Sequence, residues 1–299
     1  MARRRPRSTQ AVRQRRIADA RVRRADGLAE EGVLDGAIAD YEKAAQLDGH
    51  NPDTRVKLGD AYLEAEMPRK AYMAYHKALN IHPRHAEANF CLGEFYATIG
   101  RLRMAITAIQ KAVSCDPGRH WYALRLADLQ VLVGNLEQAR LGYEQAAELA
   151  PTEGYYHYKL AEFYMRMREF PAAVAEYEQA VRCAPVDDFY CARLGAAYVR
   201  HGAFDQARAA LSRAARLAPD NPIYRYALAD IMLLSSQDEP AEKTYATAGP
   251  LDEYYSDCLR RWRGRAGIAA LGDVGLLPAS LTDPKAVFEE DERPNRRPR

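Results

Sequence analysis

The chain has 299 residues, of which 48% are hydrophobic, and it carries 43 Lys and Arg against 41 Asp and Glu. This apolar share is ample for a large buried core and excludes a wholly disordered chain. The longest apolar stretches, such as Ile231 to Leu234, fall far short of the ~20 residues that a membrane helix needs, so no membrane span is expected.

The first predicted segment is a flexible, basic arm over residues 1–17. Residues 1–24 hold ten arginines and one acidic residue, whereas the rest of the chain has 33 basic and 40 acidic residues. The arm lacks the apolar stretch and the cleavage site of a secretory signal, although an Arg-rich organelle transit peptide is an alternative. Its basic residues are Arg3, Arg4, Arg5, Arg7, Arg13, Arg15 and Arg16.

A strictly regular repetition follows the arm. Frames of equal length that begin at 18, 52, 86, 120, 154, 188 and 222 account for every residue to 255 without an insertion or deletion. The eighth place of each frame holds Ala or Gly, and the twentieth and twenty-seventh places hold Ala in all seven frames. The prolines that close the frames are Pro83, Pro117, Pro151, Pro185 and Pro219.

Each frame has the pattern of two helices. Apolar residues recur at intervals of three and four in two runs of about a dozen residues, which is the helical period. Glycines at equivalent places, such as Gly32 and Gly100, predict a left-handed turn between the two helices. The closing proline ends the second helix. Small residues at the eighth and twentieth places allow the helices to approach closely, and larger ones such as Tyr75 fill the remaining space.

This pattern resembles the tetratricopeptide repeat over residues 18–255, in its Leu-Gly pair, its aromatic residue, its two alanines and its proline. The resemblance implies an all-α fold: a right-handed superhelical α-solenoid of seven tandem 34-residue helix-turn-helix repeats over residues 18–251. The first and last frames depart from the pattern, as terminal repeats of a solenoid commonly do.

Two segments are predicted after the repeats. Residues 252–266 are expected to form a capping helix, with Tyr254 and Leu259 packed against the last repeat and with Arg260, Arg261 and Arg263 facing water. Residues 267–299 are rich in Gly, Pro and mixed charge, which predicts a flexible charged tail.

The resemblance also implies a binding surface. In this family the first helix of each repeat lines a concave groove, and its second, fifth, ninth and twelfth places commonly point into that groove. The ninth place is acidic in six of the seven frames here, and the second and fifth places become aromatic toward the carboxyl end. The expected groove residues are Asp60, Phe90, Glu94, Trp121, Leu124, Asp128, Tyr155, Tyr158, Glu162, Phe189, Tyr226 and Asp230.

An acidic groove disfavours capture of a partner's C-terminal carboxylate, an activity known in this family. It favours extended segments in which Arg stacks on an aromatic ring and pairs with a carboxylate. An alternative is that the acids are neutralised within their own helices, because Lys57 lies three residues before Asp60 and Arg125 three before Asp128.

Catalytic motifs are absent from the sequence. It has no phosphate-binding glycine loop, no nucleophile elbow and no zinc-protease motif. His82 and His85 flank Pro83 near Glu87, but this segment is expected to be a connecting loop and no metal site is predicted. The chain is therefore expected to be no enzyme and to need no cofactor.

Three functions remain open from the sequence. The first is a non-enzymatic scaffold or adaptor that binds partner proteins or peptides in the groove, favouring basic segments. The second is an RNA- or ribosome-associated factor tethered by the Arg-rich arm. The third is a self-assembling homo-oligomer in which the arm occupies a groove. Five cysteines without a C-x-x-C pair are typical of a reducing compartment, so a cytoplasmic location is expected.

Overall fold

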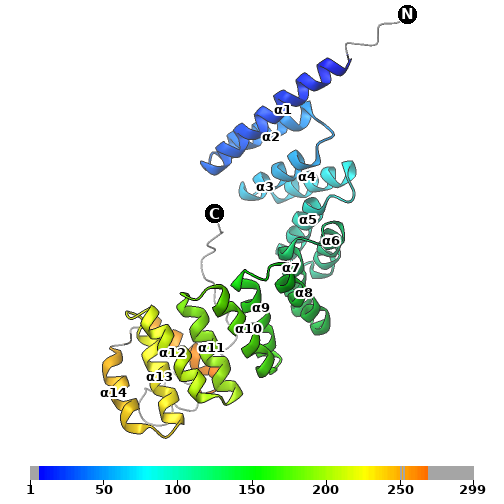
Figure 1. The fold of residues 1–299 in the computed structure, drawn as a ribbon. Coiled ribbons are helices and arrows are strands. Elements are labelled where there is room, and N and C mark those ends of the chain that lie inside the picture. The colour runs from blue at the N-terminus through cyan, green and yellow to red at the C-terminus, as the bar shows by residue number, and fades with distance from the viewer. Residues whose placement is uncertain (1–6, 250, 252, 269–299) are drawn as a thin grey trace, which may run out of the picture. The chain divides into compact units, whose positions relative to one another are not determined.

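A computed structural model describes residues 7–249, 251 and 253–268 (Figure 1). Within these residues the chain forms helices and no strand. None of the described helices is both long enough and apolar enough to cross a bilayer. The chain forms two compact units, Met1–Leu149 and Ala150–Arg299.

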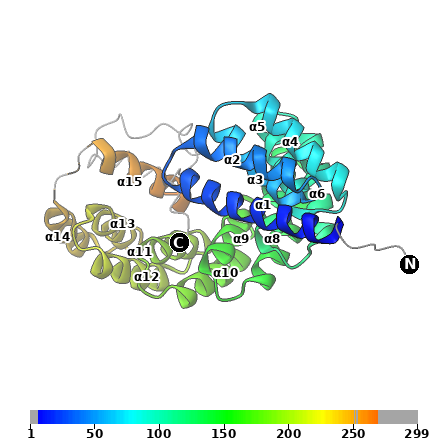
Figure 2. The same cartoon turned by 90° about the horizontal axis from the view of Figure 1, so that it is seen from above.

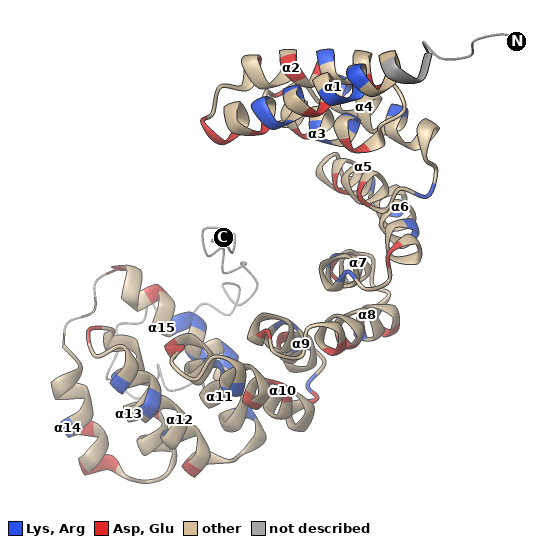
Figure 3. Ribbon diagram, turned by 45° about the horizontal axis from the view of Figure 1, so that its top comes forward, with Lys and Arg blue, Asp and Glu red and all other residues tan. Residues whose placement is uncertain are grey.

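The first unit contains four helical hairpins. Each second helix packs against the first helix of its own hairpin, and the first three second helices also pack against the next hairpin along the chain. Toward the end of this unit the first helices lie on one side and the second helices on the other (Figure 3). The helices are α1 (Arg7–Glu30), α2 (Leu34–Leu47), α3 (Pro52–Glu64), α4 (Pro68–Ile81), α5 (Ala86–Thr98), α6 (Leu102–Cys115), α7 (His120–Leu132) and α8 (Leu136–Leu149).

The second unit contains three hairpins and a further helix. The hairpins continue the regular spacing of the first unit, whereas the last helix follows a different course that is described below. The helices are α9 (Gly154–Arg166), α10 (Phe170–Cys183), α11 (Asp188–His201), α12 (Phe204–Leu217), α13 (Pro222–Leu234), α14 (Asp238–Ala248) and α15 (Glu253–Ala266).

The predicted all-α repeat fold is confirmed. From the second repeat onward, the first helix begins at the first residue of each frame, and in all seven repeats the second helix begins at the seventeenth place. This regularity follows from the absence of any insertion, because each hairpin then presents the same residues to its neighbours.

The turn inside each hairpin has a left-handed residue in all seven repeats. Glycine occupies this place in four repeats, with φ between 72° at Gly100 and 82° at Gly202. Glu66, Arg168 and Ser236 take the same conformation in the other three, with φ of 58°, 61° and 56°. The packing of the two helices therefore dictates the turn even where a side chain costs about 1–2 kcal/mol there.

The core consists of small residues at helix contacts and large residues around them. The eighth-place glycine Gly59 lies against the ring of Tyr75, and a Cβ atom on Gly59 would be 2.4 Å from Cε1 of that ring. Tyr75 is itself fully buried. The twentieth-place alanines are fully buried in every repeat, namely Ala37, Ala71, Ala105, Ala139, Ala173, Ala207 and Ala241.

The amino end differs from the expected flexible arm. Helix α1 begins at Arg7, ahead of the frame start at residue 18, so residues 7–17 are helical; Arg3, Arg4 and Arg5 lie outside the described residues. The segment contains no proline after Pro6, and arginine is a good helix former. The carboxylate of Asp40, which is 1% exposed, accepts hydrogen bonds from Arg21 at 2.7 Å and from Arg24, which fixes α1 on α2. The Arg24 guanidinium lowers the pKa of Asp40.

The carboxyl end also differs from expectation. Helix α15 lies where a capping helix is predicted, but it contacts α11 and α13, which are first helices. Tyr254 is exposed rather than packed, and Arg263 is buried rather than solvated. The predicted tail lies outside the described residues beyond Ile268.

Candidate partner-binding face

The candidate face is the set of groove residues predicted on the first helices, and each unit carries its own part. The part in the first unit comprises Asp60, Phe90, Glu94, Trp121, Leu124 and Asp128 on α3, α5 and α7. The part in the second unit comprises Tyr155, Tyr158, Glu162, Phe189, Tyr226 and Asp230 on α9, α11 and α13.

Most acids on the ninth place accept a hydrogen bond from a tyrosine of the same repeat. The hydroxyl of Tyr41 donates to Asp26 at 2.6 Å, that of Tyr75 to Asp60 at 2.7 Å and that of Tyr143 to Asp128 at 2.6 Å. Tyr177 and Tyr245 donate in the same way to Glu162 and Asp230. Each tyrosine stands at the twenty-fourth place of its frame, on the second helix. The acids thus connect the two helices of a hairpin.

A cation from the following repeat provides a second contact. Lys57 Nζ lies 2.8 Å from Asp26, Arg125 Nε lies 2.7 Å from Glu94, and Arg193 lies 3.8 Å from Glu162. Each cation stands at the sixth place of the frame that follows its acid. Lys57 and Arg125 therefore contact the preceding repeat instead of the acids in their own helices, because adjacent first helices lie side by side. Much of the acidic stripe is engaged inside the chain and is not a free anionic surface.

Asp60 has a different environment from these acids. The sixth place of the following frame is Cys91, which brings no positive charge. The pKa of Asp60 is raised from 3.8 to about 6, mainly by burial and in part by the negative charges of Glu87 and Glu64, although the hydrogen bond from Tyr75 lowers it. The ionised carboxylate of Asp60 is therefore unfavourable in the folded protein at neutral pH.

We expect Asp60→Asn to stabilise the protein at pH 7.5. Because the folded-state pKa is raised, the contribution of Asp60 to stability is greatest below pH 4 and is lost as the pH rises through about 6. Asparagine keeps an acceptor for Tyr75 without the charge, so the gain should be about 1–2 kcal/mol at pH 7.5 and close to zero at pH 4. Thermal melts at the two pH values measure it.

Asp26→Asn is the matched control. It removes an ion pair with Lys57 in the equivalent place, so it should destabilise the protein by about 0.5–1 kcal/mol at pH 7.5. Shifts of the melting temperature in the same direction for both variants would contradict the distinction between the two acids.

Aromatic side chains on the first unit's part of the face are partly packed and partly exposed. Phe90 is stacked on Tyr122 with ring centroids 4.6 Å apart, and Leu124 is buried. Trp121 is 38% exposed, and the guanidinium of Arg119 lies 4.8 Å from the centroid of its ring. Trp121 is thus an aromatic surface residue that already accommodates one arginine.

The second unit has a denser aromatic cluster. The ring of Tyr158 lies 5.3 Å from Phe189 and 5.6 Å from Tyr190, and the guanidinium of Arg193 lies 4.5 Å from Phe189. Tyr155 is 48% exposed. Tyr226 is engaged elsewhere, since its hydroxyl donates to the carbonyl of Gly249 at 2.8 Å.

Helix α15 covers part of the second unit's face. Arg263 donates two hydrogen bonds to Asp230, both at 2.6 Å, and Arg265 lies 3.7 Å from Glu162. Asp230 is fully buried, so its carboxylate needs a charged partner; even so, burial raises its pKa. Arg263 is therefore buried beside Asp230, whereas the sequence predicted that it would face water.

Some residues of the site were not predicted from the sequence. They are the tyrosines of the second helices and, on α15, Trp262 and Arg263. The tyrosines leave a readable signal: tyrosine stands at the twenty-fourth place in five repeats, and the repeat with Ala196 instead of an acid has Leu211 there. Arg263 leaves no such signal, because its contact with Asp230 depends on how α15 turns back.

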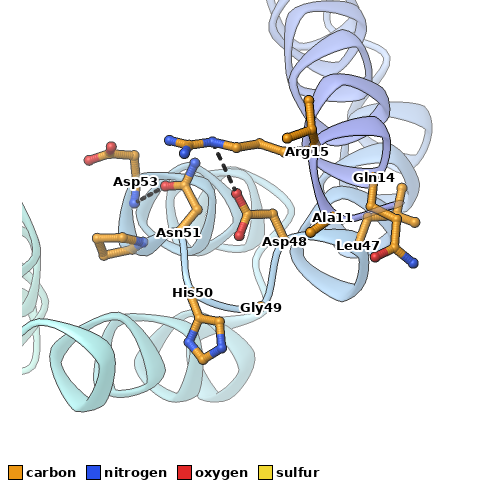
Figure 4. A pocket seen from close by; sticks show the side chains of 11 residues that line it. Ala11, Gln14, Arg15, Leu47, Asp48, Gly49, His50, Asn51 and Asp53 are labelled. Atoms are coloured by element: carbon orange, nitrogen blue, oxygen red, sulfur yellow. Dashed lines mark hydrogen bonds and ion pairs between the residues drawn. The ribbon is translucent and has the colours of Figure 1, made fainter. Parts of the chain in front are cut away.

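A cleft of about 570 Å³ lies between the start of α1 and the α2–α3 connection, and it is lined by Arg15, Asp48, His50 and Asn51 among others (Figure 4). Arg15 forms an ion pair with Asp48 at 3.7 Å, and Asn51 accepts a hydrogen bond from the backbone N–H of Asp53. Arg13 and Arg16 are exposed on α1. Of the arm arginines whose side chains the structure describes, Arg15 alone lines this cleft.

The predicted connecting loop around Pro83 has a structural role. His85 Nδ1 accepts a hydrogen bond from the backbone N–H of Ala88 at the start of α5, and its Nε2 lies 2.7 Å from Asp53. Within the described part of the chain, no three His, Cys, Asp or Glu residues are placed to hold a metal ion.

Taken together, the stacked hairpins and their bonded face define a helical-repeat protein of the solenoid class. Models of the tetratricopeptide repeat match residues 56–120, 124–188 and 190–231, and a TPR repeat model matches residues 25–65. The chain belongs to the tetratricopeptide repeat family, whose fold is generally a non-enzymatic scaffold for protein–protein interaction. No curated protein matches the sequence.

Solved structures of the same fold have low sequence identity. The C-terminal part of a TPR repeat-containing protein from Cytophaga hutchinsonii is 17% identical with a TM-score of 0.64, covering 80% of this chain and 99% of that one. Pseudomonas aeruginosa pilF is 19% identical with a TM-score of 0.58, covering 69% and 94%. YrrB, a TPR protein with an unusual peptide-binding site, is 15% identical with a TM-score of 0.51, covering 66% and 97%. These similarities concern the fold.

Proposed function

We propose that this chain is a non-enzymatic scaffold that binds partner proteins through the candidate face and favours segments that carry arginine. The observation that carries the proposal is the exposure of large aromatic side chains on first helices, Trp121 at 38% and Tyr155 at 48%. Exposed aromatic residues of this size commonly anchor protein interfaces.

The preference for arginine is supported by contacts inside the chain. Arg119 lies over Trp121 and Arg193 lies over Phe189, so guanidinium groups fit against these rings. Internal cations already neutralise several acids, so the aromatic rings would contribute more to affinity than the acidic stripe. The peptide-binding site of YrrB is in keeping with this use of the fold.

The test is a crosslinking pull-down with Trp121→Ala, Tyr155→Ala and the double variant, analysed by mass spectrometry at two salt concentrations. We expect the double variant to lose partner capture at least tenfold while keeping its helical content, since both side chains are exposed. Leu141→Ala is the matched control, because Leu141 is 48% exposed but lies on the second helix α8.

Two outcomes would contradict the proposal. One is that the double variant captures every partner as well as the parent protein does. The other is that capture disappears after nuclease treatment, which would favour an RNA-associated factor tethered by the basic arm.

A further inference from the structure

Helix α15 lies on the second unit's part of the candidate face. It contacts the first helices α11 and α13 and reaches α9 through Arg265 and Glu162. Figures 2 and 3 show α15 beside α11 and α13 rather than stacked beyond α14. A helix that merely extended the array would pack on α14, the second helix of the last hairpin, whereas α15 contacts the first helices that carry the candidate face.

The face is shaped for the residues that α15 presents. In α11 the fifth place is Ala192 and the ninth is Ala196, whereas the other first helices carry a larger residue at the fifth place and an acid at the ninth. Trp262 belongs to the same core cluster as these two alanines, is 6% exposed, and has its Nε1 3.5 Å from the carbonyl oxygen of Ala192. The two small residues provide room for the indole ring.

Acids stand on both helices that flank α11. Asp230 on α13 binds Arg263, and Glu162 on α9 lies near Arg265. Helix α15 therefore presents Trp262 with arginines one and three residues after it. The first helices present two alanines on α11, with a carboxylate on α9 to one side and another on α13 to the other. The arginines of α15 thus meet carboxylates, and its indole ring meets the small residues of α11.

The hold of α15 on the unit is limited. Its buried residues are Leu259, Trp262, Arg263 and Ala266. One of the four is charged, and a buried ion pair adds little net stability once desolvation is counted. A second helix that supplied the same contacts could therefore replace α15, at a cost set mainly by the loss of the covalent tether.

We propose that α15 is an intramolecular ligand of the face formed by α9, α11 and α13. Its displacement exposes the binding site for a partner helix with a large aromatic residue followed by arginines at the next and third positions. This inference rests on the proposed function for the existence of a partner, and it adds the partner's chemistry and the regulation of access.

The test uses the full chain and a fluorescein-labelled peptide of residues 253–268, with serine in place of Cys258. In the parent protein the tethered α15 acts at an effective concentration in the millimolar range, so we expect weak binding of the peptide by fluorescence anisotropy. A Trp262→Ala, Arg263→Ala double variant of the full chain should bind the peptide at least tenfold more tightly.

A second form of the protein keeps α15 unaltered. A protease site inserted between Gly249 and Glu253 allows α15 to be cut from the chain but left bound, and the labelled peptide should then exchange with it. A control peptide with alanine in place of the equivalents of Trp262 and Arg263 should not bind. The proposal is overturned if the peptide fails to bind both the cut chain and a double variant of parental helical content, or if the control peptide binds equally well.

This outcome is separable from the test of the proposed function. If the peptide exchanges with α15 but no partner requires Trp121 or Tyr155 for capture, the inference stands and the proposed function is refuted. Partner capture that depends on those residues, together with no peptide exchange, would do the reverse.

Discussion

Arg263→Ala is expected to weaken the packing of α15 and to destabilise the second unit by about 3–5 kcal/mol at neutral pH. The substitution leaves the fully buried carboxylate of Asp230 with the hydroxyl of Tyr245 but without its counterion, and a buried charge in that state is strongly unfavourable. Without the guanidinium, burial raises the pKa of Asp230 further, so the loss should grow as the pH rises through that pKa.

Hydrogen exchange of α15 and thermal melts at pH 5 and pH 8 measure this effect. Arg260→Ala is the matched control, since Arg260 pairs with Asp257 of the same helix at 2.9 Å and its loss should cost less than about 1 kcal/mol. A triple variant with Arg263→Met, Asp230→Leu and Tyr245→Phe should recover most of the stability, because no buried charge remains. Equal melting temperatures for Arg263→Ala and Arg260→Ala would refute the assignment of the buried pair.

Tyr75→Ala is expected to cost the first unit about 3–5 kcal/mol, measured by urea unfolding. Tyr75 is fully buried, so its removal leaves a cavity between α3 and α4. The substitution also removes the hydroxyl that donates to Asp60. Tyr75→Phe removes only that hydroxyl and should cost about 1 kcal/mol.

Gly59→Ala provides a second check on the same contact. In the parent protein its Cβ would lie 2.4 Å from the Tyr75 ring, so the variant should lose about 1–3 kcal/mol through overpacking. In the Tyr75→Ala background this cost should disappear, since the clashing ring is gone. Additive losses for the two substitutions would contradict the close approach of Gly59 and Tyr75.

The repeat architecture was predictable because its determinants are local and recur. Helix starts at residues 52, 86 and 120, the left-handed turn at Gly100 and the buried twentieth-place alanines all follow from residues within one frame. The residues of the candidate face were likewise assigned to first helices from their places in the repeating frames.

The departures involve contacts between elements that a repeating register does not specify. Helix α1 extends to Arg7 because the segment after Pro6 contains no proline and is rich in arginine, which is a good helix former. Asp26 and Glu94 bind cations of the next repeat. The sequence alone does not favour these pairs over pairs of a cation and an acid three residues apart in one helix. The path of α15 depends on a buried carboxylate that the sequence does not distinguish from the solvated ones.

Several ninth-place acids require a cation from outside their own repeat. Asp26, Glu94 and Glu162 each depend on a cation that the following hairpin supplies. The hairpin that carries Asp230 is the last of the described repeats, and Arg263 supplies that cation from α15 instead. An eighth hairpin would have to displace Arg263 from Asp230, so α15 fills the cation position that a following first helix fills at the earlier acids.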